Sequence, residues 1–194
     1  ELAMQADGVN VGKGNGLVYR KLLEDGGITR AMDKITELCN DPAGGCVFWS
    51  AGAKPPELLV SGEVVMATGW NGRFFNAIMD GAPLTQVWDG QGLDYQYMVV
   101  VDGGPNQADA MKAIKEMMST EGLAGSAKHI AYAPFRKSSL KVIEAGEPWY
   151  KDGKTNMLPE MPSSKRNTKK YFLVDPLFWA DNSTEINEQW EAMK

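Results

Sequence analysis

Apolar residues recur along much of the chain at intervals of three and four residues, which is the spacing of one face of a helix. This pattern predicts helices over residues 28–40, over 72–79, and from an N-cap at Asn106 to about residue 118. The third of these has a core-facing stripe made of Ala110, Met111, Ile114, Met117 and Met118. A brief helix is also expected at Pro55 and Pro56, because proline suits the first turn of a helix.

Short apolar runs lie between these segments and are bounded by Gly, Pro and polar residues, as strands are. Four strands are predicted, over residues 46–49, 63–68, 84–88 and 95–101. Beyond residue 133 the pattern weakens, so a long loop is expected over 146–170 and a last helix from Ser183 onward. The alternation of helix and strand predicts an α/β fold.

The composition is that of an ordinary folded chain, with 194 residues, 43% hydrophobic and 23% charged. The formal net charge of −5 makes nucleic acid an unsuitable partner, because such proteins neutralise phosphates with an excess of Lys and Arg. The longest apolar stretch, residues 98–101, is far shorter than a membrane span. The chain begins at Glu1 without Met, and we expect its native start to lie upstream, so the lack of a signal peptide excludes nothing.

The residue types that catalysis usually requires do not form a recognisable motif. His129 is the only histidine, which leaves no parts for a histidine-based triad or zinc site, and a core or surface role is expected for it. The glycine-rich segment over residues 12–16 matches neither nucleotide-binding fingerprint and predicts a flexible turn. No enzymatic activity, cofactor or metal is therefore expected.

The two cysteines, Cys39 and Cys46, flank a turn of six residues that contains Pro and Gly. The spacing is too wide for a CxxC motif. A disulfide and two reduced thiols both fit, because such a turn brings its ends together in either case.

Aromatic and polar residues gather at the ends of the predicted strands, where open α/β sheets bind ligands. Trp70 and Arg73 follow the strand over 63–68, and Asp94 and Gln96 stand at the start of the strand over 95–101. Aromatic faces beside carboxylates suit an ammonium group. Each aromatic residue taken alone would also fit a protein core.

Six segments of the chain resemble the extracellular solute-binding proteins of ABC transporters, of the spermidine/putrescine-binding type (family 1, with the type II periplasmic binding protein fold). They are SAGAKPPELL at 50–59, GEVVMATGWNGR at 62–73, LDYQY at 93–97, PNQADAM at 105–111, IAYAP at 130–134 and FWADN at 178–182. The resemblance implies an exported protein, periplasmic or extracellular, that binds a small solute and delivers it to a membrane permease.

The resemblance also implies two α/β lobes with the ligand between them, of which this chain is mainly the second, C-terminal lobe. Residues 1–92 and 135–194 would form that lobe, and 93–134 would cross over and pack on a first lobe that is missing or supplied as another chain.

Three ligand-binding residues follow from the resemblance: Trp70 and Tyr132 match aromatic residues of the cleft, and Asp7 lies where carboxylates reach the ligand. Gln96 departs from the pattern, since related sequences usually have an acidic residue there, for which Asp94 is the substitute. Arg73 favours a ligand with a carboxylate. The solute is therefore a polyamine or a zwitterion such as an ω-amino acid, and a ligand-independent interaction module is a further alternative.

Overall fold

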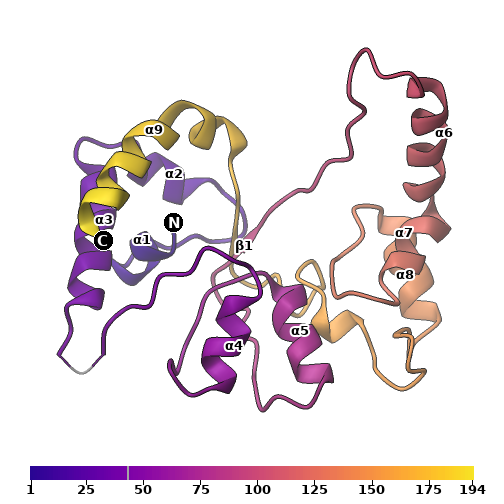
Figure 1. Ribbon diagram of the computed structural model, residues 1–194, viewed down its shortest axis with the longest axis horizontal. Helices are drawn as coiled ribbons and strands as arrows, with labels where there is room; N and C mark the ends of the chain where they lie inside the picture. The colour runs from indigo at the N-terminus through magenta and orange to yellow at the C-terminus, as the bar shows by residue number, and fades with distance from the viewer. Residues whose placement is uncertain (43) are drawn as a thin grey trace. The chain divides into compact units, whose positions relative to one another are not determined.

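The computed structural model describes residues 1–42 and 44–194, whose regular elements are mostly helices (Figure 1). In chain order the elements are α1 (Leu2–Ala6), α2 (Leu17–Leu22), α3 (Gly27–Cys39), α4 (Lys54–Val60), α5 (Asn71–Met79), β1 (Gln91–Leu93), α6 (Gln107–Met117), α7 (Thr120–Ser126), α8 (Lys137–Ala145), the 3-10 turn η1 (Leu158–Glu160), β2 (Tyr171–Leu173) and α9 (Pro176–Met193). Among the described residues, no helix has both the length and the apolar content that crossing a membrane requires.

Four predicted helices are confirmed: α3, α4, α5 and α6 begin and end within two residues of the expected limits. In α3 the apolar stripe is buried at Ile28 and Ala31, which explains why the periodicity is a reliable signal there. In α4 both prolines lie in the first turn, where their missing N–H groups leave no hydrogen bond unmade.

The four predicted strands are wrong as strands. Within the described residues the only ladder is parallel and joins β1 to β2, which pair Gln91 with Tyr171 and Leu93 with Leu173. The segments over 46–49, 63–68, 84–88 and 95–101 have no ladder partner there, and side chains such as Val65 (89% exposed) face solvent. An apolar run indicates that a segment is suited to burial. It does not show that a neighbouring strand is present to pair with the segment and bury it.

The last helix begins seven residues earlier than predicted. The Asp175 carboxylate caps α9 by accepting hydrogen bonds from the backbone N–H groups of Leu177 (3.0 Å) and Phe178 (3.2 Å), and Pro176 takes the first helical position. The predicted loop over 146–170 is confirmed except for η1, while α1, α2, α7 and α8 are elements that the apolar pattern did not reveal.

The chain divides into two compact units. The first comprises residues 1–50, 87–94 and 168–194, so it contains α1–α3, α9 and the β1–β2 pair. Its core includes Met4, Val18, Tyr19, Phe172 and Phe178. The glycine-rich segment predicted as a flexible turn is tied to β2, since Gly14 N–H donates to Tyr171 O (2.9 Å) and Tyr171 N–H donates to Gly12 O (3.0 Å).

The second unit comprises residues 51–86 and 95–167, and it contains α4 to α8 and η1. Its core is built around Phe75 of α5, whose ring packs edge-on against Tyr150 with ring centroids 5.2 Å apart. Met157, Met161 and Ile143 complete this core and are fully buried. The core therefore fixes α5 against the loop that follows α8.

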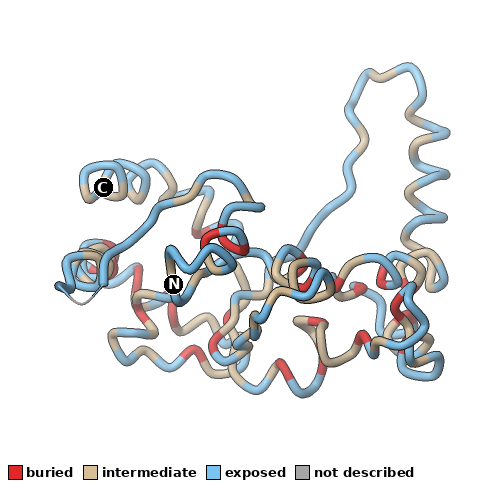
Figure 2. Tube along the Cα trace, turned by 60° about the horizontal axis from the view of Figure 1, so that its bottom comes forward, coloured by how far each residue is buried: buried red, intermediate tan, exposed pale blue. Residues whose placement is uncertain are grey.

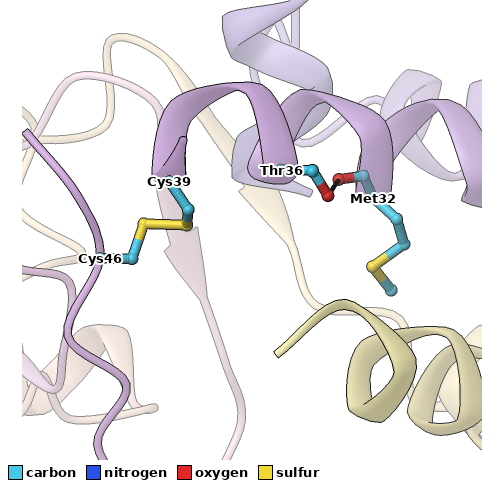
Figure 3. The surroundings of a disulfide bond; sticks show 4 residues. All are labelled: Met32, Thr36, Cys39 and Cys46. Atoms are coloured by element: carbon cyan, nitrogen blue, oxygen red, sulfur yellow. Dashed lines mark hydrogen bonds between the residues drawn. A yellow bond between two sulfur atoms is a disulfide. The ribbon is translucent and has the colours of Figure 1, made fainter. Parts of the chain in front are cut away.

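Cys39 and Cys46 form a disulfide at the C-terminal end of α3, with Cα atoms 4.8 Å apart (Figure 3). One turn earlier, Thr36 Oγ1 donates a hydrogen bond to the carbonyl oxygen of Met32 (3.0 Å). Of the two alternatives that the sequence left open, the structure contains the bridge. The bridge links the C-terminal end of α3 to Cys46.

Helix α6 differs from the other amphipathic helices because none of its residues is buried (Figure 2). Its apolar stripe is in the predicted register, but Met111 and Met117 are each more than half exposed. The stripe was expected to face a core, and within the described residues no core covers it.

Candidate functional site

The first turn of α5 is the centre of the candidate site. Trp70 is the N-cap residue of this helix and has extended backbone angles, and its side chain makes no capping hydrogen bond. The turn contains Asn71, Gly72 and Arg73 and no acidic residue. Because the first N–H groups of a helix lack partners within the helix and lie at the positive end of its dipole, this turn is suited to a negatively charged group.

The indole of Trp70 lies against the backbone of Gly52, just before α4. A Cβ atom at Gly52 would overlap the Trp70 ring, so only glycine leaves room for the indole there. The ring is nevertheless 57% exposed. Trp70 therefore has a fixed support on one side and a large apolar surface open to solvent.

The side chain of Tyr132 packs against the same turn of α5, next to Gly72. A Cβ at Gly72 would come within 2.6 Å of Cε1 of Tyr132, so this close packing also depends on glycine. Asn71 strengthens the contact, since its side-chain Nδ2 donates to the carbonyl oxygen of Ala131 (2.7 Å). Tyr132 is 44% exposed. Two of the predicted site residues, Trp70 and Tyr132, thus both lie at the start of α5.

Arg73 is the third predicted residue in this turn. Its backbone N–H donates to Trp70 O (2.9 Å), and its side chain is exposed. Within the described residues, no carboxylate forms an ion pair with it. Its guanidinium is therefore not neutralised by an ion pair in the part of the chain that the structure describes.

The remaining predicted residues are Gln96, Asp94 and Asp7. Gln96 belongs to the same unit and is exposed. Asp94 and Asp7 belong to the other unit, where Asp94 is exposed and the Asp7 carboxylate forms an ion pair with Arg30 of α3. Asp7 already has a cationic partner, so binding a ligand ammonium there would require Arg30 to share or release it.

Sequence reasoning missed an aromatic pair in the same unit. Tyr95 and Phe135 pack edge to face, with ring centroids 5.7 Å apart, and both are exposed. Phe135 directly follows the IAYAP segment (130–134) and lies three residues after Tyr132, so its closeness to that motif was the available signal. The hydrogen bond made by the Asn71 amide could not be predicted from the sequence, because its acceptor is 60 positions away.

Other kinds of site find little support in the described part of the chain. It holds no group of three or more His, Cys, Asp and Glu side chains that could bind a metal, and His129 is exposed, in keeping with a surface role. A surface depression lies in the first unit, lined by residues 22–29 with Asn182 and Glu185. It is in a different unit from the turn of α5 and contains none of the predicted site residues.

Comparisons with known proteins give a consistent result. The profile of the bacterial extracellular solute-binding proteins matches residues 1–158. A gamma-aminobutyric acid-binding protein of Pseudomonas aeruginosa is 31% identical over 192 residues, which is 99% of this chain and 49% of that protein.

Two solved structures are also similar. The PBP MotA of A. tumefaciens B6, in complex with glucopine, gives a TM-score of 0.78 at 26% identity and covers 98% of this chain and 55% of its own. A protein described as a GABA receptor gives a TM-score of 0.69 at 25% identity, over 98% of this chain and 52% of its own.

The chain therefore spans about half the length of the relatives that it matches, and its fold is part of a periplasmic-binding-protein-like fold. Since the family profile covers most of the sequence, the chain belongs to the bacterial extracellular solute-binding proteins.

Proposed function

We propose that this chain is part of the substrate-binding component of an ABC-type uptake transporter, and that it captures an amino-acid-like solute at the first turn of α5. The proposal depends on three side chains that meet at one helical turn: Trp70 and Arg73, which belong to it, and Tyr132, which packs against it. Both aromatic residues are exposed to solvent, and within the described residues the guanidinium forms no ion pair. The protein would work outside the cytoplasm and deliver the solute to a membrane permease.

The turn offers complementary partners for both ends of a zwitterion. The Arg73 guanidinium and the positive end of the α5 dipole attract a carboxylate. The faces of Trp70 and Tyr132 attract an ammonium group, at about 0.5–2 kcal/mol for each contact. The names of two relatives refer to gamma-aminobutyric acid, which has both groups, and this supports the same solute class here.

A polyamine is the second candidate solute. The aromatic rings would bind its ammonium groups, and Asp94 and Gln96 are proposed as further contacts. Arg73 speaks against it, because a cation in the first turn of α5 repels a ligand that carries only positive charges. We therefore rank the zwitterion above spermidine or putrescine.

A thermal-shift screen tests the proposed function. With both lobes present, 4-aminobutyrate at one hundred times its Kd is expected to stabilise the protein by about 2.7 kcal/mol, which raises Tm by several degrees. Trp70→Ala is expected to weaken binding by about 1–3 kcal/mol, because stacking area and cation–π contact are lost. Trp190→Ala, which removes an indole from the other unit, serves as the matched control.

The screen also separates the other possibilities. Stabilisation by spermidine alone would favour the polyamine, and no response to any amine or amino acid would favour a ligand-independent interaction module. A shift that Trp70→Ala leaves unchanged would contradict the proposed site.

The exposed stripe of α6 supports the proposal that residues 93–134 pack on a first lobe. The relatives are about twice as long as this chain, and α6 has an apolar face without cover in the described residues. Exposed apolar patches of this kind mark interfaces.

We accordingly expect the isolated chain to self-associate through α6, and replacing Met111 and Met117 together by lysine to weaken that association at least about tenfold. Sedimentation velocity at several concentrations measures the effect. Replacing Lys112 and Lys115 by glutamine, on the polar positions of the same helix, should change little. A monodisperse wild-type monomer with a high Tm would contradict the proposed packing.

A further inference from the structure

Positive charge is concentrated in one segment of this acidic protein. Residues 128–167, all in the second unit, contain eight Lys and Arg residues and four Asp and Glu residues, whereas the whole chain has a formal net charge of −5. All eight basic side chains are exposed: Lys128, Arg136, Lys137, Lys141, Lys151, Lys154, Lys165 and Arg166. We call residues 128–167 the basic segment.

The basic residues of this segment differ from the others in how they are paired. Across residues 1–42 and 44–194, none of the eight forms an ion pair with a carboxylate, while seven Lys and Arg residues elsewhere do. In five of those seven pairs the partners are three residues apart in the sequence, as with Lys112 and Asp109 of α6. Within the described residues these eight cations are therefore not held in ion pairs, although Lys154 lies near the Asp152 carboxylate and Arg166 near that of Glu160.

Two of the four carboxylates in the segment accept hydrogen bonds from the backbone of the same segment, and a third is partly buried. Glu147 accepts backbone hydrogen bonds from Trp149, Met157 and Leu158 at 2.6–2.8 Å, and Asp152 accepts them from Lys154 and Thr155 at 2.9 Å. Burial raises the pKa of the Glu160 carboxyl, because it disfavours the ionised form. The nearby Arg166 lowers that pKa, but burial is the larger effect. The four carboxylates offset half of the eight positive charges, so the segment keeps a formal net charge of +4 (eight minus four).

Local contacts place several of the lysines near one another. Lys137 and Lys141 lie four residues apart on the exposed face of α8, opposite the buried Ser139 and Ile143. Beyond the end of α8, Lys151 N–H donates to the carbonyl oxygen of Lys128 (2.9 Å).

The loop after α8 joins these lysines to the helix. The ammonium of Lys128 lies 4.4 Å from the centre of the Trp149 ring. That ring in turn packs on Gly146, where α8 ends. The α8 lysines and the loop lysines thus belong to connected parts of one packed structure.

The composition of the segment favours a membrane surface over a protein as the partner. Six of the eight cations are lysines, which act as hydrated point charges, whereas protein interfaces are enriched in arginine and depleted in lysine. Anionic headgroups attract lysines without fixed geometry. Acidic parts of the chain that lie more than one Debye length, about 8–10 Å, from the membrane are repelled by it only weakly.

We propose that the basic segment binds the anionic headgroups of a phospholipid bilayer, through Lys137 and Lys141 of α8 and through Lys151 and Lys154 in the loop that follows. This binding is independent of the solute and of the turn of α5. It would hold the protein at the surface of a membrane that contains anionic lipid.

Vesicle sedimentation tests this inference on the full 194-residue chain. The chain is expected to bind vesicles with about 30 mol% phosphatidylglycerol at about 0.01 M salt, to bind less at about 0.15 M salt, and not to bind pure phosphatidylcholine. Replacing Lys151 and Lys154 by glutamine should lower the partition coefficient by about fivefold for each lysine. Replacing Lys137 and Lys141 by glutamine should have a similar effect.

Replacing Lys112 and Lys115 of α6 by glutamine is the matched control, because it removes the same charge from the same unit and should leave the partition within about twofold. Equal binding to phosphatidylcholine would overturn the proposal, as would an equal loss in the control. Failure of the chain to bind anionic vesicles at low salt would overturn it too. This holds even if the chain binds an acidic protein in their place, which would indicate a protein partner.

Discussion

Replacing Arg73 by alanine is expected to weaken the binding of 4-aminobutyrate by at least about 2 kcal/mol, or roughly thirtyfold. The reason is that the ligand carboxylate would lose its charged partner and remain desolvated beside the first turn of α5. For spermidine the same change removes a repulsive charge, so its affinity should be unchanged or higher. Titration calorimetry with both ligands, on the protein with both lobes present, measures the difference directly.

Two further variants sharpen this experiment. Arg73→Lys keeps the charge but lacks the two-pronged geometry that binds a carboxylate, so it should restore only part of the affinity. Arg20→Ala removes an exposed arginine from α2 in the other unit and should have no effect. If Arg73→Ala leaves the affinity for both ligands unchanged, Arg73 is a solvated helix residue and not part of the site.

Replacing Phe75 by alanine is expected to lower the free energy of unfolding of the second unit by about 3–5 kcal/mol, because a fully buried ring is lost and a cavity remains. Phe75 is 1% exposed, and its ring contacts Tyr150 in the core that holds α5 in place. Denaturant-induced unfolding measures the loss. Binding should also weaken, since the first turn of α5 is positioned by that core.

Phe135→Ala provides the comparison, because this phenylalanine is exposed and its ring packs edge to face on the exposed Tyr95. Its loss should cost no more than about 1.5 kcal/mol, the upper range for an aromatic pair. Equal destabilisation by the two changes would show that Phe75 does not anchor the core as described.

Local pattern was sufficient to predict the helices that begin with a clear signal. Apolar periodicity located α3, α5 and α6, and the paired prolines located α4. The start of α9 was also encoded locally, by Asp175 followed by Pro176, but the apolar pattern drew attention to Ser183 instead.

The strands could not be predicted in the same way, since a ladder depends on a partner segment. The apolar run over 95–101 looks like a strand by itself, yet the pair that forms, β1 with β2, joins segments about 80 residues apart. The candidate site depends partly on signals within the sequence and partly on tertiary contacts. Resemblance identified Trp70 and Tyr132, whereas the hydrogen bond from Asn71 to Ala131 and the close packing over Gly52 and Gly72 depend on tertiary contacts.

Solute binding at the first turn of α5 can be observed by nuclear magnetic resonance with 4-aminobutyrate added to the protein with both lobes present. We expect the largest chemical-shift changes at the indole N–H of Trp70 and the backbone amides of Asn71, Gly72 and Arg73, with little change in α6. Saturation of binding without a shift in this turn, or with its largest shifts at the depression lined by residues 22–29, would contradict the claim.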